Sequence, residues 1–216
     1  MNRKKQDLSD LIKSKKRVAD HGEVFTPDWI VKEMLDLVKD ESSRIESRVL
    51  EPACGSGNFL VPILERKLES ATAMYRSSDF ERLQYSFLGL MSIYGVEILE
   101  DNAEECRANL LELFTSHIQS NDESIETKAA KTILAANIVE GDALTMKDRS
   151  GQPIVFPEWS YLGKGKFNRR DFQYDELLQM SSFGEDTLFA SIQPDEIFAP
   201  VKDYSPLNIK DIAENG

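Results

Sequence analysis

Apolar segments of two kinds follow one another along the first two-thirds of the chain and predict alternating strands and helices. Short runs rich in β-branched and aromatic residues are typical of buried strands, whereas apolar residues three or four positions apart are typical of helices. The patterns predict strands at 48–51, 92–98 and 137–144, and helices from about 58 into the 60s, at 79–90 and at 101–118. This alternation is typical of a parallel sheet flanked by helices, so an α/β fold is expected.

Two more helices are predicted before the first strand. Residues 7–18 have the spacing of a short amphipathic helix. Thr26 is placed to cap a second helix whose first position is Pro27, where the missing N–H costs nothing. The apolar residues that fall on one face of this second helix are Ile30, Met34, Leu37 and Val38.

The periodic pattern fades after Leu144. Residues 145–216 contain several glycines and prolines, and the stretch 120–128 is polar and is expected to be a surface segment. After Leu144 only three short segments look like strands, at 154–156, 187–192 and 197–199. The expected organisation is a basic N-terminal helix (1–20), a main domain (21–144) and an irregular C-terminal segment (145–216).

Composition restricts the class of protein. The chain has 216 residues, of which 41% are hydrophobic and 30% charged, enough for an α/β domain with a buried core. Its longest apolar runs, 59–64 and 87–93, are far shorter than the ~20 residues of a membrane-spanning helix. The N-terminus lacks the apolar stretch of a secretory signal, and two cysteines and two histidines give neither a disulfide framework nor metal-ligand spacing. A soluble cytoplasmic protein with no membrane contact and no metal is expected.

The net charge is −12, from 26 basic and 38 acidic residues. Because cations that meet phosphates dominate nucleic-acid binding, this balance disfavours a protein that coats DNA by itself. Basic residues nevertheless gather within 1–20 and at Lys164, Lys166, Arg169 and Arg170. Each cluster is either a solvated surface or a local contact for phosphate.

The strongest local motif is Glu51-Pro-Ala-Cys-Gly55-Ser-Gly57, at the turn from the first strand into a helix. Glycines there allow a tight turn and a close approach of backbone N–H groups to a ligand. No Gly-Lys-Ser/Thr follows, and Leu60 stands where a dinucleotide fingerprint has its third glycine. Glu51 would repel a pyrophosphate but suits an ammonium or sulfonium group. The motif therefore favours S-adenosylmethionine over NAD.

Two further acidic residues end the second and third strands. Glu97 is placed to accept from both ribose hydroxyls of a ligand, with Ile98 behind it against the adenine ring. Asp142 is placed to accept from the adenine amino group. Taken singly, each carboxylate could equally be a cap or a solvated side chain. Because the three acids end successive strands in order, we interpret them together as a cofactor site.

The sequence resembles the N6-adenine DNA methyltransferases, especially the modification subunits of restriction systems, over about residues 20–144. Besides the glycine motif, the matching segments are Gly22-Glu-Val-Phe25-Thr26-Pro27, Tyr94-Gly-Val-Glu97 and Gly141-Asp142-Ala143-Leu144. The resemblance implies a Rossmann-like class I S-adenosylmethionine-dependent methyltransferase fold, three-layered with a mostly parallel sheet whose C-terminal half is not recognisable. It also implies cofactor contacts from Phe25, Thr26, Pro27, Glu51, Pro52, Ala53, Cys54, Gly55, Gly57, Glu97, Ile98, Asp142 and Ala143.

The catalytic motif of that family is Asn/Asp/Ser-Pro-Pro followed by an aromatic residue, which places an acceptor and a stacking ring against a flipped base. No such tetrapeptide occurs in residues 145–216, and the nearest match is Phe156-Pro157-Glu158-Trp159, placed where the fourth strand of the sheet would end. Phe156 cannot accept a hydrogen bond. Pro157, Glu158 and Trp159 are therefore catalytic candidates only if Glu158 takes over the acceptor role, and the alternative is a surface turn.

Three functions fit these residues. The first is an N6-adenine DNA methyltransferase, or its cofactor-binding component, acting on DNA with a partner subunit in a restriction-modification or phage-defence system. A restriction, helicase or nuclease protein would be a further partner. The alternative is a non-catalytic S-adenosylmethionine-binding regulatory or assembly subunit. The third is a small-molecule or protein methyltransferase with a pocket lined by Tyr161, Phe167, Phe172 and Phe183.

Overall fold

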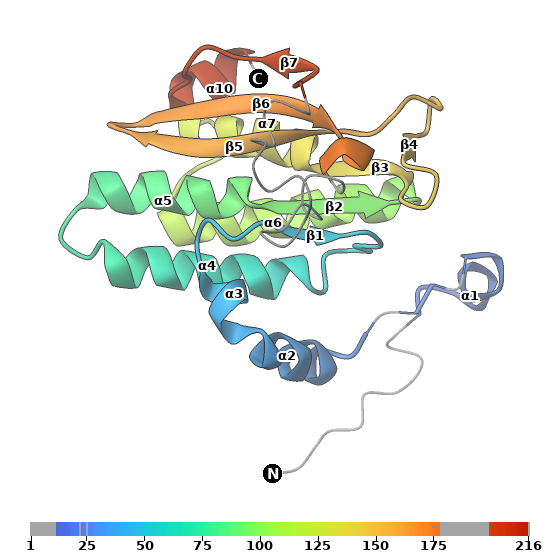
Figure 1. The fold of residues 1–216 in the computed structure, drawn as a ribbon. Coiled ribbons are helices and arrows are strands. Elements are labelled where there is room, and N and C mark those ends of the chain that lie inside the picture. The colour runs from blue at the N-terminus through green and yellow to red at the C-terminus, as the bar shows by residue number, and fades with distance from the viewer. Residues whose placement is uncertain (1–11, 22, 25, 178–198, 216) are drawn as a thin grey trace, which may run out of the picture.

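A short mixed sheet lies between a group of helices and a second, antiparallel sheet (Figure 1). The computed structural model describes residues 12–21, 23–24, 26–177 and 199–215. The strand expected at 187–192, most of that at 197–199 and the first part of the helix expected at 7–18 lie outside these residues. The elements are α1 (Lys15–His21), α2 (Asp28–Leu37), α3 (Lys39–Ser43), β1 (Val49–Glu51), α4 (Leu60–Met74), α5 (Asp79–Met91), β2 (Ile93–Glu97), α6 (Glu100–Ile118), α7 (Ile125–Asn137), β3 (Ile138–Asp142), β4 (Lys147–Asp148), β5 (Val155–Gly163), β6 (Lys166–Gln173), β7 (Lys202–Asp203) and α10 (Ile209–Asn215).

The mixed sheet has the strand order β1-β2-β3-β4. β1, β2 and β3 pair in parallel, whereas the short β4 pairs antiparallel with β3. The three strands and the helices α4, α5 and α6 confirm the alternation expected from the sequence. Because parallel strands run in one direction, their carboxyl ends meet at one edge of the sheet. Glu51 and Glu97 both lie at that edge.

β2 is buried on both faces, and this decides how the two sheets come together. Ile93 joins the larger apolar cluster with the helices, while Tyr94 and Val96 point to the opposite face. There the ring of Phe156 lies 5.5 Å from Tyr94 and 5.5 Å from Tyr174. The sequence pattern led us to expect helices on both faces. Instead, side chains from β5 and from the residues after β6 supply the apolar cover that a fully buried strand requires.

The C-terminal segment, expected to be irregular, holds an antiparallel sheet with the order β5-β6-β7. Gly163, Lys164 and Gly165 form the turn of the β5–β6 hairpin with φ angles of 84°, 52° and 72°. Trp159 and Phe167 from this hairpin join the larger apolar cluster. The strand-like segment at 154–156 therefore leads into an antiparallel sheet and is not a fourth parallel strand. The domain boundary at residue 144 stays a prediction.

A helix, α7, occupies part of the stretch 120–128, which was expected to be a polar surface segment. Ser124 is its N-cap. At the other end Asn137 is fully buried. Its Nδ2 donates to two backbone carbonyls, one of them that of Ile93 at 2.9 Å, and its Oδ1 accepts from Trp159 Nε1 at 3.2 Å. One side chain thus joins α7, β2 and β5.

α2 differs from the expectation in its start and in its buried face. Its N-cap is Pro27 rather than Thr26, and no side chain caps it. Val31 and Leu35 are its buried residues. The predicted apolar face is turned toward solvent instead, with exposed side chains at Met34, Leu37 and Val38. None of the described helices has both the length and the apolar character needed to cross a membrane.

Lys67 on α4 is a buried cation that holds the chain just before β1. Its side chain is fully buried. Its Nζ donates to the backbone carbonyls of Arg44, Ile45 and Ser47 at 2.8, 3.1 and 2.5 Å. These bonds satisfy carbonyls of the turn between α3 and β1 and offset the cost of burying the charge. The position of β1, and hence of Glu51 at its end, depends on them.

We expect Lys67→Met to lower the free energy of unfolding by about 2–4 kcal/mol, because methionine fills the space but leaves the carbonyls without their donor. Lys131→Met, on the exposed side of α7, should change it by less than about 0.5 kcal/mol. Urea unfolding at pH 7 measures both. Equal midpoints for the two variants would show that Lys67 does not hold this turn.

Candidate ligand-binding site

A glycine-containing loop, residues 52–59, joins β1 to α4 at the carboxyl edge of the sheet. Gly55 and Gly57 have φ angles of 53° and 98°, a region that strains residues with a side chain. A Cβ on Gly57 would also lie 3.1 Å from a cysteine sulfur of α6. Cys54 N donates to Val96 O at 3.0 Å, which bonds the loop to β2. The tight turn expected from the motif is therefore present.

Glu97 fixes this loop from the end of β2. The residue is only 7% exposed. Its Oε2 accepts from Gly55 N at 2.8 Å and its Oε1 from Leu99 N at 3.0 Å. Hydrogen bonds to a carboxylate are stronger than those between neutral groups. Each oxygen has lone pairs beyond its backbone bond, so Glu97 can organise the loop and still accept from a ligand.

Glu51 lies partly buried at the end of β1. Its Oε1 accepts from Ala53 N at 3.3 Å. Burial raises the pKa of Glu51 above its usual value of 4.5, and the hydrogen bond from Ala53 opposes this shift. Among the described residues, no lysine or arginine contributes to the pKa shift of Glu51. A carboxylate without a cation is thus held next to the glycine loop.

A cavity of about 310 Å³ opens between these elements. Its volume is at the lower end of the ~300–1,000 Å³ typical of small-molecule sites. The predicted cofactor contacts that line it are Thr26, Glu51, Ala53, Cys54, Gly55, Glu97 and Ile98. Lining residues that the sequence analysis missed are Glu23, Val24, Asn58, Phe59, Leu99 and Asn102.

Other predicted contacts are not among the lining residues: Pro27, Pro52, Gly57, Asp142 and Ala143. Phe25 lies outside the described residues. Asp142 does end β3 at the same edge of the sheet. Its Oδ1 accepts from Leu144 N at 2.9 Å, and this bond is the main cause of its lowered pKa. A contact between Asp142 and an adenine amino group stays a prediction.

Two asparagines that the sequence analysis missed support the loop. Asn58 Nδ2 donates to Thr26 O at 3.2 Å, and Asn109 Nδ2 donates to Ser56 O at 2.9 Å. Asn58 could have been suspected because it directly follows the last glycine of the motif. No sequence signal marks Asn109, since its role depends on how α6 packs beside the loop.

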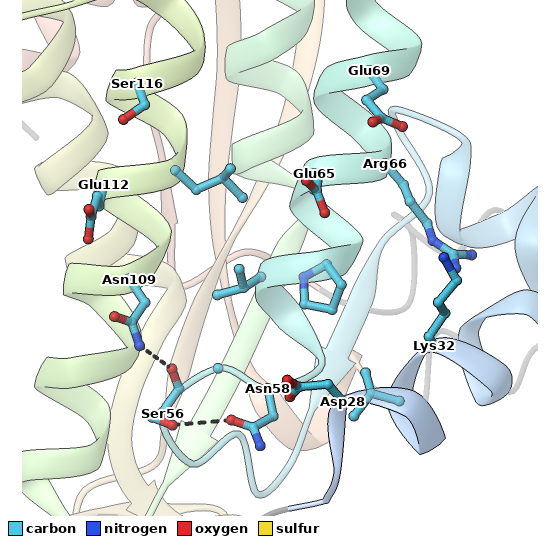
Figure 2. A pocket seen from close by; sticks show the side chains of 15 residues that line it. Asp28, Lys32, Ser56, Asn58, Glu65, Arg66, Glu69, Asn109, Glu112 and Ser116 are labelled. Carbon is cyan, nitrogen blue, oxygen red and sulfur yellow. Dashed lines mark hydrogen bonds between the residues drawn. The ribbon is translucent and has the colours of Figure 1, made fainter. Parts of the chain in front are cut away.

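A larger cavity of about 790 Å³ lies on the other side of the loop, between α4, α6 and α2 (Figure 2). Glu65, Glu69 and Glu112 lie along its walls, and Asn58 borders both cavities. These three carboxylates are solvent-exposed. The smaller cavity is therefore the stronger candidate for a ligand site, because a partly buried and a buried carboxylate line it beside the glycine loop.

The weak catalytic candidates in β5 make structural contacts. Pro157 O accepts from a tyrosine hydroxyl of β2 at 2.8 Å. Glu158 pairs with Arg48 at 2.8 Å and with Arg170 at 2.6 Å. Trp159 is 6% exposed. None of the three lines the smaller cavity, and the carboxylate of Glu158 is held in place by two arginines.

The C-terminal basic cluster is largely neutralised within the fold. Arg169 is 9% exposed, pairs with Asp171 at 2.8 Å and lies over the ring of Tyr204. Arg170 pairs with Glu158, and Lys166 lies 3.7 Å from an aspartate of α10. These three residues therefore offer little free charge for phosphate, whereas Lys164, the fourth member of the predicted cluster, is exposed in the hairpin turn.

The aromatic pocket of the third function also lacks support. Phe167 and Phe172 are fully buried and belong to the core. Tyr161 packs against Phe167, with ring centroids 5.1 Å apart, and lines a separate cavity of about 470 Å³ whose lining includes neither Phe167 nor Phe172. Phe183 lies outside the described residues. In the part of the chain that the structure describes, no group of His, Cys, Asp or Glu side chains is placed to hold a metal.

The fold and the site define a class of protein: an α/β chain whose ligand cavity lies at the carboxyl ends of parallel strands, beside a glycine loop and two acidic strand ends. A family model described as N-6 DNA Methylase matches residues 11–140. The chain belongs to this family, which confirms the resemblance found in the sequence. The family implies a class I methyltransferase fold and a DNA methyltransferase-like function, and its members generally use S-adenosylmethionine. Comparisons with curated proteins and with solved structures gave no match.

The two carboxylates should respond in opposite ways to neutralisation. Glu51→Gln removes a partly buried charge and keeps an acceptor for Ala53 N–H, so it should raise the free energy of unfolding by up to about 1 kcal/mol. Glu97→Gln leaves one oxygen for two backbone donors and should lower it by about 1–3 kcal/mol. Urea unfolding at pH 7 measures both changes. A lower free energy of unfolding for Glu51→Gln would contradict the conclusion that the Glu51 carboxylate has no cationic partner among the described residues.

The effect of Glu51→Gln should also depend on pH. The folded-state pKa of Glu51 is raised, so the folded protein binds the proton more tightly than the unfolded chain does. Glu51 therefore costs stability as the pH rises from about 4.5 through the folded pKa. The gain from Glu51→Gln should be full near pH 7 and vanish below about pH 4. A gain that is the same at pH 4 and pH 7 would point to another cause.

Proposed function

We propose that the smaller cavity binds S-adenosylmethionine and that the protein acts in N6-adenine methylation of DNA. The observation that carries the proposal is Glu51, a partly buried carboxylate that lines the cavity without a cationic partner in the described chain. S-adenosylmethionine carries an ammonium and a sulfonium group, which would supply the missing charge. The pyrophosphate of a dinucleotide would be repelled by the same carboxylate.

The remaining residues fit the other parts of this cofactor. Glu97 would accept from the ribose hydroxyls with the lone pairs that its bonds to Gly55 and Leu99 leave. Ile98 is 59% exposed and lines the cavity, so an adenine ring would cover it. Asp142 would accept from the adenine amino group at the end of β3. Binding outside the carboxyl ends of parallel strands supports a Rossmann-like class I arrangement.

When bound, S-adenosylmethionine would supply an electrophilic methyl group: an adenine amino nitrogen of DNA would bond to the methyl carbon as the carbon–sulfur bond breaks, S-adenosylhomocysteine would leave, and the amino group would lose one proton to water. The residues of this chain would contribute by position. Glu51 and Glu97 would hold the charged methionine part and the ribose of the cofactor, and the loop backbone at Gly55 would lie beside them. Fixing the reacting atoms in this way removes much of the entropic barrier.

A second candidate is a cofactor-binding component that needs a partner chain to bind the target base, or a non-catalytic regulatory or assembly subunit. Glu158 favours it, because this residue is held by Arg48 and Arg170 and lies outside the cavity lining. The 216 residues also contain no Pro-Pro pair. The proposed partners are DNA together with another subunit, and a restriction, helicase or nuclease protein.

Calorimetric titration with S-adenosylmethionine tests cofactor binding. We expect a dissociation constant of about 1–100 μM, or roughly −8 to −5.5 kcal/mol. Gly55→Val should abolish binding, because valine is strained at a φ of 53° and would displace the loop backbone. Gly151→Val is the matched control, since Gly151 has a φ of 80° in open space beyond β4, and it should bind like wild type. No binding by wild type, or binding by Gly55→Val, would contradict the assignment.

Methyl transfer to DNA separates the two candidates. The purified chain is incubated with methyl-labelled S-adenosylmethionine and unmethylated DNA, and N6-methyladenine is measured by mass spectrometry. Transfer by the chain alone would support the enzyme. Cofactor binding without transfer would support the binding component, and transfer that appears only with a second subunit would identify a divided enzyme.

A further inference from the structure

We propose that Arg17 is the latch of a strap that closes the smaller cavity and sets how long a ligand stays bound. The strap is defined as the described residues between Ile12 and Pro27. Three of them, Glu23, Val24 and Thr26, line the cavity. The inference rests on the proposed function, since a residence time requires a ligand in this cavity.

Arg17 ties the strap to α6 by bridging two carboxylates. Its Nη1 donates to Asp101 Oδ2 at 2.6 Å, and its Nη2 donates to Asp101 Oδ1 at 3.1 Å. The same Nη2 donates to Glu23 Oε1 at 2.9 Å, and Nε donates to the other oxygen of Glu23. Hydrogen bonding to Arg17 is the main cause of the lowered pKa of both carboxyl groups. One guanidinium group therefore spans the strap and the first turn of the helix.

Buried Asn102 and exposed Lys13 complete the network. Asn102 Nδ2 donates to Glu23 Oε1 at 2.7 Å, and its Oδ1 accepts from Lys13 Nζ at 2.6 Å. Lys13 also pairs with Glu105 one turn further along α6. Asn102 is 1% exposed and the Glu23 side chain 8%, whereas the Asp101 side chain is 55% exposed. Water and salt thus reach the outer side of the latch first.

Polar contacts are what hold the strap. None of its described residues belongs to either buried apolar cluster or to the side chains that pack against those clusters. Its other tie to the site is the bond from Asn58 Nδ2 to Thr26 O at 3.2 Å. The remaining cavity walls belong to the sheet, the glycine loop and α6. Segments with few buried apolar contacts open at the lowest free-energy cost, so the strap is the wall that moves when a ligand leaves.

A pulse–chase experiment with labelled S-adenosylmethionine and an excess of unlabelled cofactor measures the dissociation rate. Arg17→Gln should raise this rate about five- to tenfold at low salt, because it removes every tie of the guanidinium group. Arg149→Gln is the matched control. Arg149 also bridges two carboxylates beside the start of α6, Glu100 at 2.5 Å and Glu140 at 3.4 Å, but these pairs lie outside the strap. The dissociation rate of S-adenosylmethionine from Arg149→Gln should equal that from the wild-type protein.

Salt and a second variant give independent measures of the same latch. Raising the salt concentration from about 0.05 to about 0.5 M should bring the wild-type rate toward that of Arg17→Gln and change the variant rate less, because within the described strap only the ion pairs of Lys13 remain to be screened in the variant. Arg17→Lys keeps the charge but loses the bridging geometry, so its rate should lie between the two. Asp101→Asn should speed dissociation, and adding it to Arg17→Gln should have a smaller effect than it has alone, because among the described residues only the ion pair with Lys13 at 3.8 Å is left to lose.

The outcomes separate the latch from the proposed function. A wild-type protein that does not bind S-adenosylmethionine would overturn both. A wild type that binds, with dissociation rates within twofold of those of Arg17→Gln and Arg17→Lys, would overturn the latch alone. Urea unfolding of each variant shows whether a faster rate comes from the strap or from a less stable fold, and a rate that follows global stability would also overturn the latch.

Discussion

The carboxylate of Glu97 is the contact on which the candidate site depends. It ends a strand whose residues are all buried, so the core sets its position. From there it binds Gly55 N in the glycine loop and Leu99 N at the start of α6. The two oxygens of Glu97 therefore fix the positions of both the glycine loop and the start of α6, which line the cavity. A surface carboxylate could not do this, because water would compete for both backbone donors.

The antiparallel sheet allows β2 to be buried on both faces without adding unpaired charge near the candidate site. Phe156 and Tyr174 cover the face of β2 that the helices leave open. The carboxylates of the hairpin find cations within it, since Glu158 pairs with Arg170 and Asp171 with Arg169. The hairpin thus supplies apolar cover at one face of the sheet, while the carboxyl edge stays open for a ligand.

What the sequence could predict was mainly local. The glycine motif, the acidic strand ends and the helices between them are each encoded within a run of consecutive residues, at most 19 for α6, and the structure has them. The hairpin was missed because charged residues interrupt its apolar alternation, and Arg170 lies directly opposite Glu158 in the sheet. Periodicity also could not tell which face of α2 is covered. The tie between Arg17 and Asp101 joins residues 84 positions apart, and no local pattern encodes it.

Paired and unpaired carboxylates distinguish the proposed cofactor site from the segment 156–159, the weak candidate for base recognition. Glu158 and Asp171 have their arginines, and Glu97 has two backbone donors. Glu51 has one backbone donor at 3.3 Å and bears the cost of partial burial. Selection for stability alone would remove such a cost, and the proposed cationic ligand would offset it where Glu51 lines the cavity. The segment 156–159 shows the opposite condition: the charge of Glu158 is already balanced by Arg48 and Arg170, and the segment lies outside the lining of the smaller cavity.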